Sequence, residues 1–105
     1  ERFYNESADA ARRLGRRAVL LVGTVHLASL QRVAGPDVLV VASAPHSLLF
    51  PRAAAVVQQC GVGTLGQVLR AGRPTLCVPW SHDQPDNADR ARRLGMARVL
   101  YPRRY

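Results

Sequence analysis

The chain has 105 residues, of which 48% are hydrophobic, and it carries a formal net charge of +8 at pH 7. This length suits one domain with one modest core, and the hydrophobic content excludes a solvated, disordered tail. No apolar run approaches the roughly 20 residues of a membrane span and no signal peptide is present, so we expect a soluble, cytoplasmic protein.

The chain begins with a predicted helix, followed by apolar runs of strand length. In the helix, over residues 7–15, Ser7 is the expected N-cap, Asp9 and Arg13 lie four residues apart on the outer face, and Gly15 ends the helix. The apolar runs lie at 18–22, 37–42, 53–57 and 75–79, with a short fifth at 97–101. They do not alternate with polar residues, which is typical of parallel strands buried on both faces.

Two further helices are predicted after the third and fourth apolar runs, at 64–72 and 85–95. The second has Pro85 at a first-turn position and two Asp–Arg pairs at a spacing of four, 86/90 and 89/93. Alternating strands and helices predict an α/β fold, a Rossmann-like parallel sheet with flanking helices and right-handed crossovers. We find no repeat, linker or low-complexity segment and expect a single domain over residues 1–105.

The segment QQCGVGT, residues 58–64, lies between a predicted strand and a predicted helix. Gly61 and Gly63 would let a ligand approach the backbone and would allow positive φ. The helix expected to start near Thr64 would direct free N–H groups towards an anion, most often a phosphate. A tight turn without a ligand explains the same residues equally well.

A second loop, after the next strand, offers Ser81, His82, Asp83 and Gln84 together. A carboxylate beside an amide suits the vicinal hydroxyls of a sugar. The structural alternative is an Asp that caps the helix beside a spectator Gln. Two neighbouring strand ends, one for phosphate and one for a polyol, suggest a nucleotide-sugar site.

Residues 44–95 resemble the donor-binding half of GT-B glycosyltransferases of the UDP-glucosyl/glucuronosyltransferase-like family, with the pattern HHGGxGT…ALxxGxPxxxxPxxxDQ. Residues 3–43 match this family more loosely. The resemblance implies the C-terminal domain of a two-domain enzyme. It assigns the donor diphosphate to Gln59, Gly61, Gly63 and Thr64, and the sugar to Asp83 and Gln84. It assigns the base and ribose to Ser43, Ala44, His46 and Gln67.

The chain departs from the family pattern at several of these positions. Gln59 stands where the family has a histidine that donates to the donor phosphate. An amide keeps an N–H donor but cannot become cationic, which would weaken leaving-group stabilisation by about 1–2 kcal/mol. Ser43 replaces the base-stacking tryptophan of many plant members, His46 stands at a glutamine position, and Gln67 replaces a glutamate on the ribose.

Other reactive side chains are expected to have lesser roles. Cys60 is interpreted as a small packing residue, His82 as a residue at the rim of the site, and His26 as a surface or packing residue. Cys60 and Cys77 lack a paired spacing, which indicates reduced thiols rather than a disulfide framework. No CxxC or HxxxH spacing supports a zinc site with His46 and His82, and we expect no metal or cofactor.

The resemblance implies inverting transfer of a hexose from a nucleotide-diphosphate sugar, by default UDP-glucose, to a hydroxyl of a small-molecule or lipid acceptor. The base would come from an acceptor-binding domain, which we expect this chain to lack. We therefore expect a truncated donor-binding domain that is inactive alone, with exposed edges that favour self-association.

Two alternatives to a glycosyltransferase remain open. The first is a non-catalytic nucleotide-sugar-binding module, which the glutamine at position 59 favours. The second is a basic nucleic-acid-binding domain. All 15 basic residues are arginine and only 6% of residues are aromatic. Both features are unusual for a protein that binds nucleic acid. The net positive charge is the one feature that favours such a domain, and we expect no nucleic-acid partner.

Overall fold

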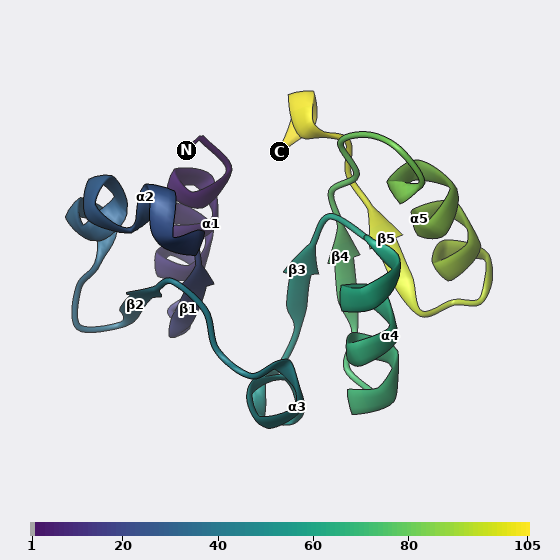
Figure 1. The fold of residues 1–105 in the computed structure, drawn as a ribbon, viewed down its shortest axis with the longest axis horizontal. Helices are drawn as coiled ribbons and strands as arrows, with labels where there is room; N and C mark the ends of the chain where they lie inside the picture. The colour runs from purple at the N-terminus through teal and green to yellow at the C-terminus, as the bar shows by residue number, and fades with distance from the viewer. Residues whose placement is uncertain (1) are drawn as a thin grey trace. The chain divides into compact units, whose positions relative to one another are not determined.

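The structure is a computed structural model and describes residues 2–105. It divides into two compact units, one ending at Ala44 and one running from Pro45 to Tyr105. Because each unit has its own sheet and core, the two are described separately (Figure 1). The expectation of one domain over residues 1–105 stays a prediction.

The first unit contains α1 (Arg2–Arg13), β1 (Ala18–Leu21), α2 (Gly23–Leu30), a 3₁₀ turn at Gln31–Val33 and β2 (Val38–Val41). Strands β1 and β2 pair in parallel, with Leu20 opposite Val40. These two residues face a core to which α1 contributes Ala8 and α2 contributes Leu30. Both helices therefore cover the same face of the two-stranded sheet.

The second unit contains α3 (His46–Leu49), a 3₁₀ turn at Phe50–Arg52, β3 (Val56–Gln58), α4 (Val62–Ala71), β4 (Thr75–Cys77), α5 (Gln84–Arg93), β5 (Ala97–Val99) and a 3₁₀ turn at Pro102–Arg104. The strands form a parallel sheet in the order β3-β4-β5. Val68 of α4 packs on Val56, and Ala88 of α5 packs with Cys77. Because Val56 lies opposite Thr75, two residues before Cys77, α4 and α5 cover the same face.

The predicted fold class is confirmed: the strands are parallel, helices flank them, and the fold is α/β. The strands lie in two sheets, of two and three strands. Pro85 lies in the first turn of α5, and the expected ion pairs join Asp86 to Arg90 and Asp89 to Arg93. A hydrogen bond from Arg92 holds the pKa of Asp89 below its usual value.

Several predicted boundaries are wrong. The first helix already includes Arg2, so Ser7 is not an N-cap; its hydroxyl instead donates to the Phe3 carbonyl one turn earlier. Within the same helix, Asp9 pairs with Arg12, three residues on, with 3.6 Å between charged atoms.

Helices α2 and α3 were not predicted from the sequence. Helix α2 follows β1 directly without a capping side chain, and α3 has only four residues.

Within residues 2–105, no helix is both long enough and apolar enough to cross a membrane.

Candidate functional site

The loop between β3 and α4 contains a left-handed residue, but it is not one of the glycines. Cys60 has φ 70°, whereas Gly61 has φ −62° and is the N-cap of α4. Gly63 lies inside the first turn, because α4 begins at Val62 and not near Thr64. The expectation that these glycines supply positive φ is therefore wrong.

The two glycines leave open space at the start of α4. Apart from the adjacent residues and the backbone of α4 itself, a Cβ atom built on Gly61 or Gly63 would meet nothing within 4 Å. The first hydrogen bond of the helix runs from the Leu65 N–H to the Gly61 carbonyl, 2.9 Å. The N–H groups of residues 62–64 therefore have no partner in the helix, and they carry its positive dipole end.

The amide of Gln84 is fixed by its own loop. Its Oε1 accepts hydrogen bonds from the backbone N–H groups of Trp80, at 2.8 Å, and Ser81, at 3.2 Å. Two donors around one atom identify that atom as the oxygen, so Nε2 lies on the other side. That nitrogen donates to Oε1 of Gln59 across the two loops, at 3.4 Å.

This contact also orients Gln59. Because its Oε1 accepts from Gln84, its own Nε2 must face away from that residue. Among residues 2–105, no group accepts a hydrogen bond from this nitrogen. Gln59 is exposed at the C-terminal end of β3, close in sequence to the start of α4. An N–H₂ donor without a partner among residues 2–105 is therefore available in the loop that leads into α4.

The preceding glutamine has a different environment. Gln58 is only 5% exposed and donates from Nε2 to the hydroxyl of Thr75 on the neighbouring strand, at 3.0 Å. Thr75 in turn donates to the Val56 carbonyl, at 2.8 Å. Gln58, the last residue of β3, thus faces the core, and Gln59, directly after the strand, faces solvent, which continues the alternation of the strand.

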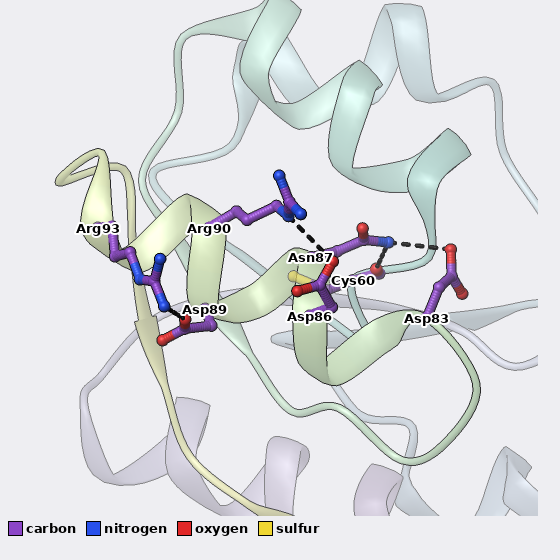
Figure 2. A network of polar contacts seen from close by, with 7 residues as sticks. All are labelled: Cys60, Asp83, Asp86, Asn87, Asp89, Arg90 and Arg93. Atoms are coloured by element: carbon purple, nitrogen blue, oxygen red, sulfur yellow. Dashed lines mark hydrogen bonds and ion pairs between the residues drawn. The ribbon is translucent and has the colours of Figure 1, made fainter.

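A residue that sequence analysis did not single out connects the two loops. Asn87, in α5, donates from Nδ2 to the Cys60 carbonyl at 3.0 Å and to Oδ2 of Asp83 at 3.1 Å (Figure 2). Its spacing of four residues from Asp83 on a helix was the available signal. Asp83 stands at the N-cap position of α5, as the structural alternative expected, but its side chain makes no capping hydrogen bond to the helix.

The two cysteines form a disulfide between Cys60 and Cys77, with 5.7 Å between their Cα atoms. The expectation of reduced thiols without a disulfide is therefore wrong. Spacing along the chain was a poor guide, because β3 and β4 are neighbours and Gln58 lies opposite Cys77. This pairing brings Cys60, two residues later, next to its partner. The disulfide packs against Ala88 of α5.

His82 is the second non-glycine residue with positive φ, 60°. Its Nδ1 lies 2.8 Å from the hydroxyl of Ser81, and both side chains are exposed. A strained backbone is frequent at functional loops, and this one precedes Asp83 directly. His26 lies in α2 of the other unit, where it is exposed.

Two of the residues expected to bind base and ribose line one cavity of about 80 Å³ in the second unit. Its lining residues are His46, Ser47, Pro51, Gln67, Arg70 and Ala71. One face of the His46 ring stacks on Phe50, with ring centroids 4.5 Å apart. Ser43 and Ala44 end the first unit, after β2.

In the part of the chain that the structure describes, no group of three or more side chains has the composition and proximity of a metal site.

No known family model matches the chain. It is similar to an O-mycaminosyltylonolide 6-deoxyallosyltransferase of Streptomyces fradiae, with 45% identity over 88% of this chain and 21% of that protein. A vancomycin aglycone glucosyltransferase of Amycolatopsis orientalis is 38% identical over 84% of this chain and 21% of its own length. The chain thus spans about a fifth of the length of these curated relatives.

Solved structures agree with the sequence relatives. The glycotransferase of kitacinnamycin matches 96% of this chain and 26% of its own, with a TM-score of 0.88 and 27% identity. The glycosyltransferase VinC in complex with DTDP matches 86% of this chain and 30% of its own, with a TM-score of 0.68; at 24% identity this likeness shows the fold alone. By its sequence relatives and its fold, the chain belongs to the GT-B glycosyltransferases.

Proposed function

We propose that the chain is the donor-binding part of a glycosyltransferase that transfers a hexose from a nucleotide-diphosphate sugar, UDP-glucose by default. The reaction would invert the anomeric carbon and add the sugar to a hydroxyl of a small-molecule or lipid acceptor. The acceptor-binding domain of the parent enzyme would be its partner. A cytoplasmic location and self-association of the chain alone stay predictions.

One observation carries this proposal: two neighbouring strand-end loops present complementary groups and are hydrogen-bonded to each other. Gln59 contributes an N–H₂ donor beside the open start of α4, where Gly61 and Gly63 leave room. In the second loop, Oδ1 of Asp83 has no hydrogen-bond partner among residues 2–105, while Oδ2 is held by Asn87. Donors suit a diphosphate, and a fixed carboxylate suits sugar hydroxyls.

Each part of the donor then has a proposed position. The diphosphate lies at Gln59, Gly61, Gly63 and Thr64, and these N–H donors stabilise the charge that grows on the leaving group. The sugar lies against Asp83 and Gln84. His46 and Gln67, at the cavity of the second unit, hold base and ribose. Ser43 and Ala44, at the end of the first unit, stay sequence-based predictions for the base. A histidine of the acceptor-binding domain would deprotonate the acceptor hydroxyl.

A non-catalytic nucleotide-sugar-binding module is the second candidate, and Gln59 favours it. The amide can donate a hydrogen bond but cannot become cationic, so it supports binding better than it supports departure of the diphosphate. The two candidates share one donor site and differ only in transfer. Binding therefore tests what they have in common.

The test is an amide NMR titration of the chain with UDP, dTDP and UDP-glucose. Binding at the proposed site should shift the signals of Gly61, Gly63 and Thr64 with each diphosphate. UDP-glucose should add shifts at Asp83 and Gln84. A dispersed spectrum with no change at these residues for any of the three ligands would refute the proposal.

A further inference from the structure

Asn87 uses both hydrogens of its side-chain amide, one for each loop of the candidate site. One hydrogen bond reaches the Cys60 carbonyl at 3.0 Å and the other reaches Oδ2 of Asp83 at 3.1 Å (Figure 2). Two oxygen acceptors identify the donating atom as nitrogen, so the orientation of this amide is determined by its neighbours. The side chain is half-buried.

The bond to Cys60 also sets the direction of a neighbouring donor. The carbonyl of Cys60 and the N–H of Gly61 belong to one trans peptide plane, in which the two groups point in opposite directions. A carbonyl held by Asn87 on the α5 side therefore directs the Gly61 N–H away from α5. Cys60 is left-handed, a conformation that persists only where its surroundings enforce it.

The bond to Asp83 fixes the second loop in the same way. Oδ2 is occupied by Asn87, which selects one rotamer of the aspartate and leaves Oδ1 as the available acceptor. Other contacts already hold the two loops in place: the disulfide joins Cys60 to Cys77, and the Gln84 amide bridges to Gln59. What Asn87 adds is the direction of one donor and one acceptor.

We propose that Asn87 is a positioning residue for donor binding. It directs the Gly61 N–H towards the diphosphate and the Asp83 carboxylate towards the sugar hydroxyls, so that one amide aligns both halves of the donor site. This inference rests on the proposed function, because it assigns the diphosphate and the sugar to the same two loops.

The test compares three variants by calorimetry with UDP and UDP-glucose. N87D keeps the shape of the side chain and removes both donors, and N87L removes all polar contacts. D86N is the matched control, because Asp86 neighbours Asn87 on α5 but is exposed and pairs with Arg90. At pH 8, N87D and N87L should bind both ligands about tenfold more weakly, and D86N should stay within about twofold of wild type.

A pH profile separates positioning from general support of the fold. In N87D at pH 5.5, a proton shared between the introduced carboxyl and Asp83 would supply an O–H donor again. UDP-glucose affinity should then recover by about threefold or more relative to pH 8, whereas N87L should show no recovery. The D86N control over the same range accounts for any effect of pH that does not involve position 87, and melting temperatures show whether each variant is folded.

The outcomes separate this inference from the proposed function. A wild-type chain that binds UDP-glucose, with N87D and N87L that bind it equally well, would overturn the role of Asn87 and leave the proposed function standing. Equal losses in both variants with no recovery at low pH would also overturn positioning. A folded wild-type chain that binds no nucleotide would refute the proposed function first, and this inference with it.

Discussion

At the residue scale, the most informative feature is a chain of amide contacts that starts from the backbone. Trp80 and Ser81 fix the orientation of Gln84, and Gln84 in turn fixes Gln59. The donor nitrogen Nε2 of Gln59 is thereby directed away from Gln84. A glutamine that replaces a histidine at this position would keep one function of the imidazole, donation, and lose the other, positive charge.

This orientation predicts the effect of an isosteric change at position 59. Q59E keeps an acceptor for Gln84 but removes the N–H₂ donor and adds a negative charge near the proposed diphosphate. UDP affinity should fall by about 2 kcal/mol, roughly thirtyfold, as measured by calorimetry. Q59H, which keeps an N–H donor at this position, should bind UDP within a factor of about three of wild type. Unchanged binding by Q59E would mean that Gln59 does not touch the diphosphate.

Sequence reasoning reached some site residues and missed others for identifiable reasons. The carboxylate of Asp83 and the amide of Gln84 were recognisable as a sequence pattern. The structure brings Gln84 within hydrogen-bond distance of Gln59. Asn87 was missed because its partners include the carbonyl of Cys60, and a backbone acceptor has no signature in sequence. Positive φ was expected at glycines, but tertiary contacts enforce it at Cys60.

At the scale of elements, the alternation of strands and helices was predictable and the ends of elements were not. The apolar run 53–57 predicted a strand that lies at Val56–Gln58 in the structure. Its polar last residue, Gln58, is accommodated because Thr75 on β4 accepts its hydrogen bond. The pairing of β3 with β4 thus determines where β3 ends and brings Cys60 next to Cys77. A pattern in a single sequence does not contain this pairing.

The disulfide predicts a redox dependence of stability. It closes a loop with a sequence separation of 17 residues, for which the chain-entropy model gives roughly 3 kcal/mol. Urea unfolding with dithiothreitol should therefore show a free energy of unfolding lower by about 3 kcal/mol than without it. The C60S/C77S variant should not respond to the reductant. Alkylation of both cysteines in denatured, unreduced protein would contradict the disulfide.

The β3–β4 pair predicts a stabilising substitution. Oε1 of Gln58 is buried and, among residues 2–105, has no hydrogen-bond partner. An unpaired buried acceptor is costly, so Q58L, which removes the amide and fills a similar volume, should raise the free energy of unfolding by about 1 kcal/mol. T75V should lower it by about 1–2 kcal/mol, because the Val56 carbonyl loses its donor. A destabilised Q58L would indicate that Oε1 is solvated.

At the scale of the whole molecule, the proposed division of the reaction between two domains has a testable consequence. The chain spans about a fifth of the length of its curated relatives. The groups proposed to bind the diphosphate and the sugar lie in the second unit, and the proposed base would come from an acceptor-binding domain. We therefore predict that the chain alone releases no UDP from UDP-glucose above the buffer rate, with or without sterol and macrolide acceptors. UDP release that H82A abolishes would instead identify His82 as a base.

The net charge of +8 bears on the nucleic-acid alternative. Part of the basic charge is neutralised locally, since Asp86 pairs with Arg90, and Asp89 pairs with both Arg92 and Arg93. Ion pairs of this kind leave fewer arginines for a phosphate backbone. A site for one diphosphate makes few ionic contacts, whereas a nucleic-acid surface makes many, and the salt dependence of binding reports that number.

Raising NaCl from 50 to 200 mM should therefore weaken UDP binding by no more than about threefold. Binding of a 20-nucleotide RNA should fall by about tenfold or more over the same range, and at 150 mM NaCl the RNA should not displace UDP. Fluorescence competition with labelled UDP measures both effects, with a 20-residue poly-arginine peptide as a control for charge alone. An RNA that displaces UDP at 150 mM NaCl at concentrations at which the poly-arginine control does not bind the RNA would favour a nucleic-acid partner, because binding there would exceed what charge alone supplies.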